Sequence, residues 1–300
     1  MKEIVDVCVI TYCSAKYVLQ TLDSIYAQTY PNIRLIISDD CSKDNTVEIC
    51  QQWLVDHGER FIDTTILETP YNQGIVFNCK RAFAKVESSY YMMIAGDDYL
   101  DSTHIEKCMA KYQEMPDAGF IYTSSNLVLE LEGKIIQEDV SKFREGNIFE
   151  DLLLLNFWPK SGSFLFRTEV MKSIGGYNTA IWVEDYDYAL RIAKRYPIGW
   201  VKEFLMFYRL HDANAGRDSI RLLTALMDTL SQYSSHPSYG EAYARLEKRL
   251  IAAAKNENPN YLLRVAVTTF NGRYLKAYVQ AKIHQLKKYA KTIYHYHQSK

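Results

Sequence analysis

Five short apolar runs alternate with helical patterns over the first 125 residues, and this alternation constrains the fold more than any other feature. The runs VDVCVI, IRLIISDD, TTILETP, YYMMIAGDD and GFIYTSS have the length and the β-branched or aromatic content of strands. Strands that alternate with helices form parallel sheets. The pattern therefore predicts an α/β fold with a mainly parallel, twisted sheet flanked by helices.

Polar loops follow three of these predicted strands, at the end where parallel sheets bind ligands. Residues 11–15 follow the first strand, 39–44 the second and 96–101 the fourth. Because the carboxyl ends of parallel strands lie along one edge, we expect the three loops to converge. Asp97 and Asp98 come directly after a buried strand, and adjacent carboxylates there suit a divalent cation. A turn that uses Gly and Asp only to reverse the chain is the alternative.

Charge and cysteine content bear on the class of protein. The formal net charge is −1, so no global positive field marks a nucleic-acid-binding protein, and we expect no nucleic-acid partner. None of the six cysteines forms a CxxC pair or lies beyond Cys108, which predicts reduced thiols in the cytoplasm. The N-terminus lacks a signal-peptide pattern, and no apolar run reaches the roughly 18 residues that span a bilayer.

The remaining sequence predicts two further parts of the chain. We expect one domain over residues 1–218, with one half at 1–125 and a second half at 126–218. Its segment 126–150 is charged and looks like an excursion from the sheet. Residues 219–300 are basic, rich in tyrosine and helical in pattern, so they form a predicted C-terminal extension.

The ordered motifs of residues 4–215 resemble those of the family-two glycosyltransferases, which have the GT-A fold. The motif residues here are Thr11-Tyr12-Cys13, Asp39-Asp40-Cys41-Ser42, Asn72-Gln73-Gly74 with Asn78, Asp97-Asp98, Gly175-Gly176-Tyr177 with Glu184-Asp185-Tyr186-Asp187 and Arg191, and Tyr208-Arg209-Leu210-His211. Two positions depart from the family pattern. Cys13 stands where the family usually has Asn, and Ala95 stands where a longer carboxylate motif has its first Asp.

The resemblance implies an inverting, metal-dependent transfer of a sugar. It assigns nucleotide binding to the half at 1–125, and acceptor binding and catalysis to the half at 126–218. The donor would be a UDP-sugar, and the acceptor a hydroxyl of a glycan or lipid-linked saccharide, as in cell-surface polysaccharide synthesis. A Mn²⁺ or Mg²⁺ ion would neutralise the departing diphosphate. The residues assigned to the nucleotide-sugar are Thr11, Tyr12, Asp39, Asp40, Asn72, Gly74, Asn78 and Asp97. Asp98 and His211 are assigned to the metal, although the division of roles between Asp97 and Asp98 stays open.

Asp185 is the candidate general base. Inverting transfer needs one carboxylate that takes the proton of the attacking hydroxyl, and such a base contributes about 10²–10⁴ in rate. Alternatively, Glu184, Asp185 and Asp187 complement a helix dipole, at about 0.3–1 kcal/mol each. Three acids within four residues exceed what a helix start needs, so we favour the catalytic interpretation.

Two other functions, that of a nucleotidyltransferase and that of a non-catalytic binding module, would require different sequence features. A metal-dependent nucleotidyltransferase should have a Gly-rich loop with Lys or Arg after the first strand, and residues 11–15 have neither feature. A non-catalytic nucleotide-sugar-binding module should not need both Asp98 and Asp185.

The basic segment 274–297 predicts a helix with an apolar stripe. The stripe consists of Leu275, Tyr278, Val279, Ile283, Leu286 and Ala290. Lysines on the opposite face would suit peripheral contact with the inner face of an anionic membrane, or with a lipid-linked acceptor. Packing on the main domain, with the lysines in solvent, is the alternative.

Overall fold

The computed structural model describes residues 2–211, 219–269 and 272–298, without the side chains of 269, 286 and 288–298. Contacts divide the chain into two compact units, Met1–Asn214 and Ala215–Lys300. The first unit confirms the predicted α/β class. Its sheet and its covering helices position every residue assigned to the site.

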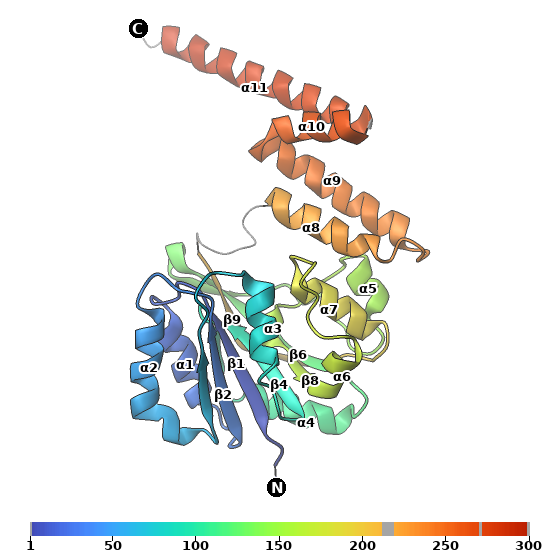
Figure 1. Cartoon of the computed structure of the whole chain (residues 1–300). Helices are drawn as coiled ribbons and strands as arrows, with labels where there is room; N and C mark the ends of the chain where they lie inside the picture. The colour runs from blue at the N-terminus through green and yellow to red at the C-terminus, as the bar shows by residue number, and fades with distance from the viewer. Residues whose placement is uncertain (1, 212–218, 270–271, 299–300) are drawn as a thin grey trace. The chain divides into compact units, whose positions relative to one another are not determined.

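A sheet of nine strands, counted over the described residues, forms the centre of the first unit (Figure 1). The strand order is β3-β2-β1-β4-β8-β6-β9-β5, and β7 pairs with β6 off this path. The strands are β1 (Val5–Thr11), β2 (Ile33–Asp39), β3 (Thr64–Leu67), β4 (Tyr90–Ala95), β5 (Tyr99–Leu100), β6 (Phe120–Leu129), β7 (Lys134–Gln137), β8 (Leu165–Arg167) and β9 (Gly199–Leu210).

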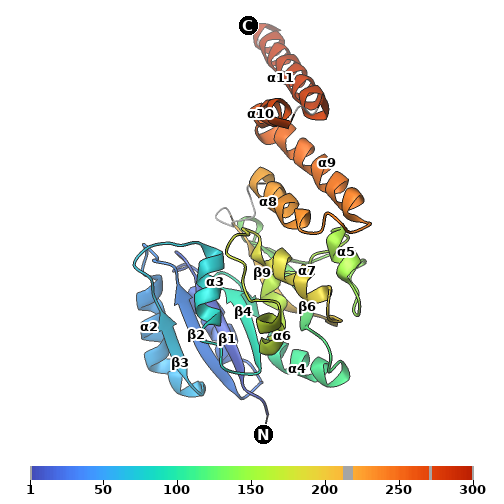
Figure 2. The same ribbon diagram turned by 45° about the vertical axis from the view of Figure 1, so that its right-hand side comes forward.

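The predicted parallel arrangement is found in β3, β2, β1 and β4 (Figure 2). Thr11 lies beside Asp39 in this register, and Ile10 lies beside Ala95, so the three polar loops leave the sheet at one edge. The second half of the chain adds antiparallel pairs, because β8 runs opposite to both β4 and β6. Only the β6–β9 pair is parallel among the described strands there.

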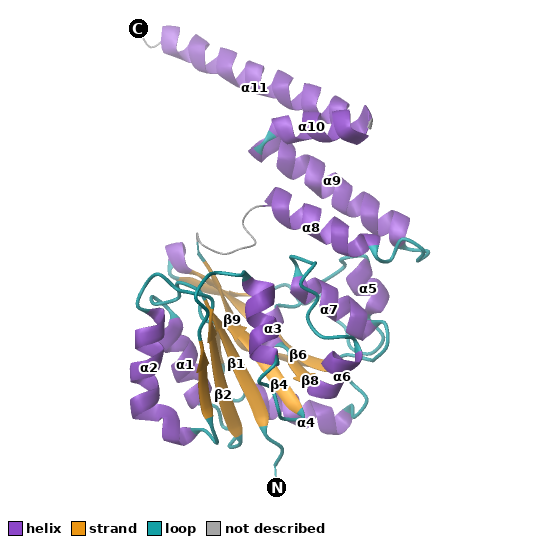
Figure 3. Cartoon of the chain, viewed as in Figure 1, coloured by secondary structure: helices purple, strands orange, loops and turns teal. Residues whose placement is uncertain are grey.

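Helices cover both faces of the sheet (Figures 1 and 3). The helices α1 (Val18–Tyr26), α2 (Thr46–His57) and α4 (His104–Glu114) share one core with alternate residues of β1 and β2. The opposite face carries α3 (Ile75–Phe83), α6 (Thr168–Ser173) and α7 (Glu184–Ala193). Every residue of β1 is therefore buried, which explains its continuous apolar run.

The predicted excursion at 126–150 is largely a β-hairpin. β6 continues to Leu129 and pairs with β7 across a turn that contains Gly133. Gly133 has a φ of 60°, a left-handed conformation that glycine adopts without steric cost. The short helix α5 (Phe149–Leu153) follows and contacts α7.

The second unit contains α8 (Ser219–Ser231), α9 (Tyr239–Glu257), α10 (Pro259–Thr269) and α11 (Gly272–Gln298). Residues of α9, α10 and α11 form its small apolar core. The buried residues of α11 are Tyr274, Ala277 and Ala281. No helix in the described part of the chain is both long and apolar enough to cross a bilayer.

The apolar stripe predicted on α11 is not the face of the helix that packs against the core of the second unit. Leu275, Val279 and Ile283 are 48%, 47% and 48% exposed, while the buried residues lie one position earlier or two positions later along the helix. Tyr278 is partly buried against the core. The side chains of Leu286 and Ala290 lie outside the described residues.

Candidate active site

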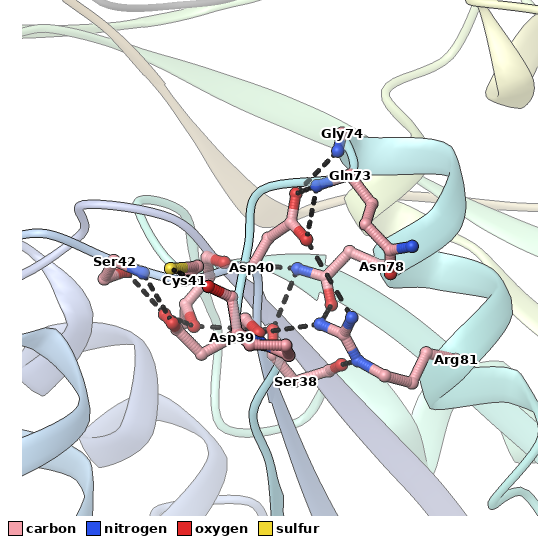
Figure 4. A network of polar contacts seen from close by, with 11 residues as sticks. Ser38, Asp39, Asp40, Cys41, Ser42, Gln73, Gly74, Asn78 and Arg81 are labelled. Atoms are coloured by element: carbon pink, nitrogen blue, oxygen red, sulfur yellow. Dashed lines mark hydrogen bonds and ion pairs between the residues drawn. The ribbon is translucent and has the colours of Figure 1, made fainter.

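Asp39 ties the loop after β2 to the end of β1. The hydroxyl of Thr11 donates to Asp39 Oδ1 at 2.9 Å, and the amide of Ser42 donates to Asp39 Oδ2 at 2.7 Å. The Ser42 hydroxyl in turn accepts from the Cys13 amide at 2.7 Å. These bonds are drawn in part in Figure 4. Asp39 and Ser42 thus hold two neighbouring loops, and contact of Asp39 with a nucleotide stays a prediction.

Asp40 fixes the turn that precedes α3. Its side chain is only 2% exposed and accepts from the amides of Gln73 at 3.1 Å and Gly74 at 2.7 Å (Figure 4). Gly74 has a φ of 91°, which favours glycine at this position. The carboxylate also lies 3.8 Å from a guanidinium nitrogen of Arg81. Its contact with a base edge stays a prediction, because its partners within the chain are backbone amides and this arginine.

Asn78 and Arg81 clamp α3 onto the ends of β1 and β2. The Asn78 amide donates to the carbonyls of Thr11 at 3.1 Å and Ser38 at 2.9 Å. Arg81 donates to the Asp39 carbonyl at 2.7 Å and to Asn78 Oδ1 at 2.8 Å (Figure 4). These bonds hold the Arg81 side chain against the strand ends.

Tyr12 and Asn72 lie at the exposed rim. The Tyr12 side chain is 51% exposed, and Asn72 is also exposed. Cys13, next to Tyr12, has a φ of 51°. Asn is several-fold enriched in this left-handed conformation, so the backbone explains why Asn is usual at the position that Cys13 occupies.

The acidic pair lies in the turn after β4, and its two carboxylates have different partners. Asp98 is buried, and its Oδ1 accepts from the Arg209 amide at 2.8 Å. Asp97 Oδ2 lies 2.9 Å from His211 Nε2. The carboxylate beside the histidine is therefore that of Asp97, whereas the sequence assignment joined His211 with Asp98.

Arg209 is the residue that sequence reasoning overlooked, although it lies within a quoted motif. Its Nε donates to the Asp97 carbonyl at 2.8 Å, while its backbone amide holds the Asp98 carboxylate. The guanidinium donates to Gln20 Oε1 at 2.5 Å and lies 4.6 Å from the centroid of the Tyr17 ring. The sequence feature that could have identified Arg209 is a cationic residue near the end of a largely apolar strand, because a buried cation needs partners.

The charge balance of this turn depends on burial and on Arg209. Burial raises the pKa of Asp98 well above its usual value, and the neighbouring Asp97 charge adds to the rise. The Arg209 guanidinium and amide oppose it. The rise in pKa shows that the ionised form of the Asp98 carboxyl is unfavourable here, and a cation in the turn would stabilise it.

Asp97 and His211 suit a divalent ion whose remaining ligands come from a substrate. A carboxylate oxygen and an imidazole nitrogen both bind Mn²⁺, and Mg²⁺ is commonly held by one or two carboxylates plus substrate phosphates. The described residues contain no group of three or more His, Cys, Asp or Glu side chains arranged around one metal position. An ion bound to these two residues would take its remaining ligands from water or from a bound phosphate.

Glu184 and Asp185 begin α7 and repel each other. Burial raises the pKa of Asp185 to about 6, while Lys160 opposes the rise. Burial and the Asp185 charge raise the pKa of Glu184. The Asp185 carboxylate is a stronger proton acceptor than an ordinary aspartate at neutral pH.

Lys160 lies near enough to both acidic groups to influence them. Its charge lowers the pKa of Asp98 as well as that of Asp185, and its Nζ lies 4.9 Å from the centroid of the Tyr208 ring. Burial raises the pKa of Tyr208, and both Asp98 and Asp185 add to that rise. The acidic turn and the start of α7 therefore face the same region of the first unit.

Asp187 and Arg191 have a structural role. Arg191 donates to Asp187 Oδ2 from two nitrogens, at 2.9 and 2.6 Å, and Asp187 is fully buried. Arg191 also donates to the carbonyls of Ile174 at 2.7 Å and Gly176 at 2.9 Å, which secures the Gly-Gly turn to α7. Asp187 is therefore part of a structural ion pair, and Glu184 and Asp185 are the two acids left as candidates for a catalytic role.

Comparisons with known proteins identify the class of protein. The chain matches the model of Glycosyl transferase family 2 over residues 6–159, just over half its length. It therefore belongs to glycosyl transferase family 2, as its motifs predicted. This membership argues against a nucleotidyltransferase.

Among curated relatives, the chain is 22% identical over 215 residues to a chondroitin synthase of Escherichia coli, covering 70% of this chain and 29% of that protein. It is 26% identical over 172 residues to an uncharacterized glycosyltransferase of Haemophilus influenzae, covering 57% and 55%. The matched regions thus span between about a third and about half of these relatives.

Solved structures confirm the predicted GT-A fold. S. aureus TarS 1-349 in complex with UDP has a TM-score of 0.64 at 16% identity, covering 93% of this chain and 80% of that one. The mannosyltransferase PcManGT from Pyrobaculum calidifontis, in complex with GDP-Man and Mn²⁺, also has a TM-score of 0.64 at 16% identity, with 95% and 88% covered.

Replacing Arg209 with Met should destabilise the first unit. Loss of the guanidinium leaves the Asp97 carbonyl and Gln20 Oε1 without their donor and removes a positive charge near Asp98, although the backbone amide bond to Asp98 remains. We expect a cost of about 2 kcal/mol in the free energy of unfolding. Urea denaturation followed by tryptophan fluorescence measures this, since all four tryptophans lie in the first unit.

The control for this measurement is Arg245→Met on α9, where the arginine is exposed and pairs with Glu241 at the surface. We expect a change within about 0.5 kcal/mol for that variant. Equal stability of the two variants contradicts the anchoring role of Arg209.

Proposed function

We propose that this chain is an inverting glycosyltransferase that moves a sugar from a UDP-sugar to a hydroxyl of a glycan or lipid-linked saccharide. One observation carries the proposal. A carboxylate beside a histidine, Asp97 with His211, and a carboxylate of raised pKa, Asp185, both lie near the Tyr208 side chain. The UDP complex of TarS supports UDP as the nucleotide.

The acidic turn would hold Mn²⁺ or Mg²⁺ together with the donor diphosphate. We assign Asp97 and His211 as the protein ligands, because Asp97 Oδ2 lies 2.9 Å from His211 Nε2. This pair replaces the pair Asp98 and His211 of the sequence assignment. The ion supplies positive charge to the leaving group. Asp98 would orient the ribose or the sugar from a position that Arg209 fixes.

The strand ends beside this turn would bind the nucleotide. Tyr12 and Asn72 are exposed there and would line the base and ribose. Thr11, Asp39, Asp40, Gly74 and Asn78 would shape that pocket, since their bonds fix the loops after β1, β2 and β3. The six free thiols fit a reducing compartment such as the cytoplasm.

Asp185 would act as the general base. It takes the proton from the acceptor hydroxyl while that oxygen forms a bond to the anomeric carbon. The bond from the anomeric carbon to the diphosphate oxygen breaks on the opposite face, so the configuration inverts. A raised pKa suits this role, because proton transfer is most efficient when the pKa of the base approaches the working pH.

The variant Asp185→Asn tests this role. It should keep donor affinity and lower turnover at least about a hundredfold, the size expected for loss of a general base. Transfer from a UDP-sugar and calorimetric binding of UDP measure the two effects. Asp117→Asn, the same change at an exposed position, serves as the control. Near-normal turnover of the Asp185 variant removes Asp185 from this role, whereas UDP binding without any turnover in the wild type favours a non-catalytic binding module.

The pH dependence of turnover should report the same carboxylate. Because the pKa of Asp185 is raised to about 6, the base is protonated and inactive below that pH and active above it. Turnover should therefore fall about tenfold for each pH unit below 6. A rate profile that stays flat between pH 5 and pH 7 contradicts the assignment.

We also propose that α11 contacts an anionic membrane surface. The exposed residues Leu275, Val279 and Ile283 are spaced four apart and form one apolar stripe. Lys276 and Lys282 flank the stripe, and the described first turn has no acids. An apolar stripe with basic flanks is typical of helices that lie in the membrane interface.

Vesicle flotation tests this contact. The full chain should float with phosphatidylglycerol vesicles, and replacing the three stripe residues with Ser should abolish flotation. The matched control replaces three exposed apolar residues of the first unit with Ser, namely Val55, Ile62 and Leu131. Equal flotation of the two triple variants contradicts the proposed contact.

A further inference from the structure

The ring of Tyr17 contacts two side chains that hold the acidic turn. Its centroid lies 5.0 Å from that of the His211 imidazole, with an angle of 28° between the two planes, so the rings are stacked. The guanidinium carbon of Arg209 lies 4.6 Å from the centroid of the same tyrosine ring. Tyr17 belongs to none of the motifs that assigned the site, and the proposed reaction does not use it.

The position of the two side chains along the chain explains why one ring reaches both. Arg209 lies in β9, and His211 follows Leu210, the last residue of that strand. Side chains two residues apart on a strand point to the same face. Tyr17 directly precedes α1, and its side chain is partly buried. The start of α1 thus packs against both side chains at the end of β9.

Both of these side chains also contact Asp97. His211 Nε2 lies 2.9 Å from Asp97 Oδ2, and Arg209 Nε donates to the Asp97 carbonyl at 2.8 Å. The His211 side chain is only 13% exposed, so the packing around it restricts how its ring can turn. Tyr17 therefore contacts the two residues that hold Asp97, and it does so next to the assigned metal ligands.

The orientation of the imidazole matters, because a histidine that binds a metal must direct one ring nitrogen at the ion. The torsion about the Cβ–Cγ bond of histidine has broad minima, so the side chain alone does not fix the plane of its ring. Stacking on a neighbouring ring favours one plane, and such pairs contribute about 0.5–1.5 kcal/mol beyond the area that they bury. The Tyr17 ring therefore restricts the direction of His211 Nε2.

Polar groups hold Tyr17 itself in place. Lys16 Nζ lies 4.8 Å from the centroid of its ring and donates to Glu130 Oε1 at 2.6 Å. Hydrogen bonding from Lys16 lowers the pKa of Glu130, and the Tyr17 hydroxyl adds to this effect. The Glu130 carboxylate also lies 3.6 Å from Arg209 Nη1. The turn between β6 and β7, which contains Glu130, thus contacts the same group of side chains.

We propose that Tyr17 is a positioning residue for the metal site, whose ring holds the His211 imidazole in the orientation that directs Nε2 toward Asp97 and a divalent ion. The proposal rests on the metal-dependent function proposed above, because it names the residue that orients one of the assigned ligands. Tyr17 touches neither the ion nor the donor in this role. The ring, and not the hydroxyl, is the part that acts on His211.

Calorimetric binding of UDP to the full chain, first in EDTA and then in Mn²⁺, tests this role. The dissociation constant in EDTA divided by that in Mn²⁺ measures the part of donor binding that depends on the metal. Tyr17→Leu removes the ring, and Tyr17→Phe keeps the ring without the hydroxyl. The matched control is Tyr26→Leu on the same helix, where the tyrosine ring lies 5.1 Å from the ring of His57, a residue not assigned to the site.

Tyr17→Leu should lower this ratio about tenfold, the size expected when a residue that orients a metal ligand is lost. Its UDP affinity in EDTA should equal that of the wild type. Tyr17→Phe and Tyr26→Leu should keep the wild-type ratio. Tyr17→Met should show the same loss as Tyr17→Leu, and it replaces that variant if urea denaturation shows that Tyr17→Leu does not fold.

Three results overturn the positioning role. A wild-type ratio in Tyr17→Leu shows that the imidazole is oriented without the ring. An equal loss in Tyr17→Phe assigns the effect to the hydroxyl. A loss of UDP affinity in EDTA shows that removal of the ring disturbs the nucleotide site as a whole. A ratio of one in the wild type instead contradicts the metal site of the proposed function, and the role of Tyr17 fails with it.

Discussion

Two acidic residues, Asp97 and Asp98, are adjacent at the carboxyl edge of the sheet, where their charges repel each other. The position of this acidic turn depends on hydrogen bonds from Arg209. Arg209 binds the Asp97 carbonyl through its side chain and the Asp98 carboxylate through its amide. Because Arg209 lies in β9 and the acids follow β4, this contact joins the two halves of the first unit. The parallel strands of the first half and the mixed strands of the second meet at the acidic turn.

Several polar side chains at this edge of the sheet hold loops in place. Asp40 binds the turn before α3, Asp39 binds the loop after β2, and Asn78 binds the carbonyls of two strand ends. Backbone donors and acceptors beyond a strand end need partners, and these side chains supply them. A nucleotide would therefore meet a rim already fixed in position, which lowers the entropy cost of binding.

The sequence predicted the α/β fold, the convergence of three loops and the family, because local periodicity and motif order are written along the chain. It could not predict which acid faces His211, since that depends on a long-range contact through Arg209. It also did not specify the bonds of Arg81 to the strand ends or the packing face of α11, where Tyr274 and Ala277 are inside. Each of these features depends on tertiary partners, which hydrophobic periodicity does not specify.

The proposed transfer depends on one divalent ion that the acidic turn and a donor diphosphate bind together. Electron paramagnetic resonance of free Mn²⁺ tests it directly, by titrating the ion into the chain, into UDP and into both. We expect the chain with UDP to remove far more of the free Mn²⁺ signal than the chain and UDP remove separately, and Asp97→Asn to abolish the excess. A loss of free Mn²⁺ signal equal to the sum of the two separate losses contradicts a shared metal site.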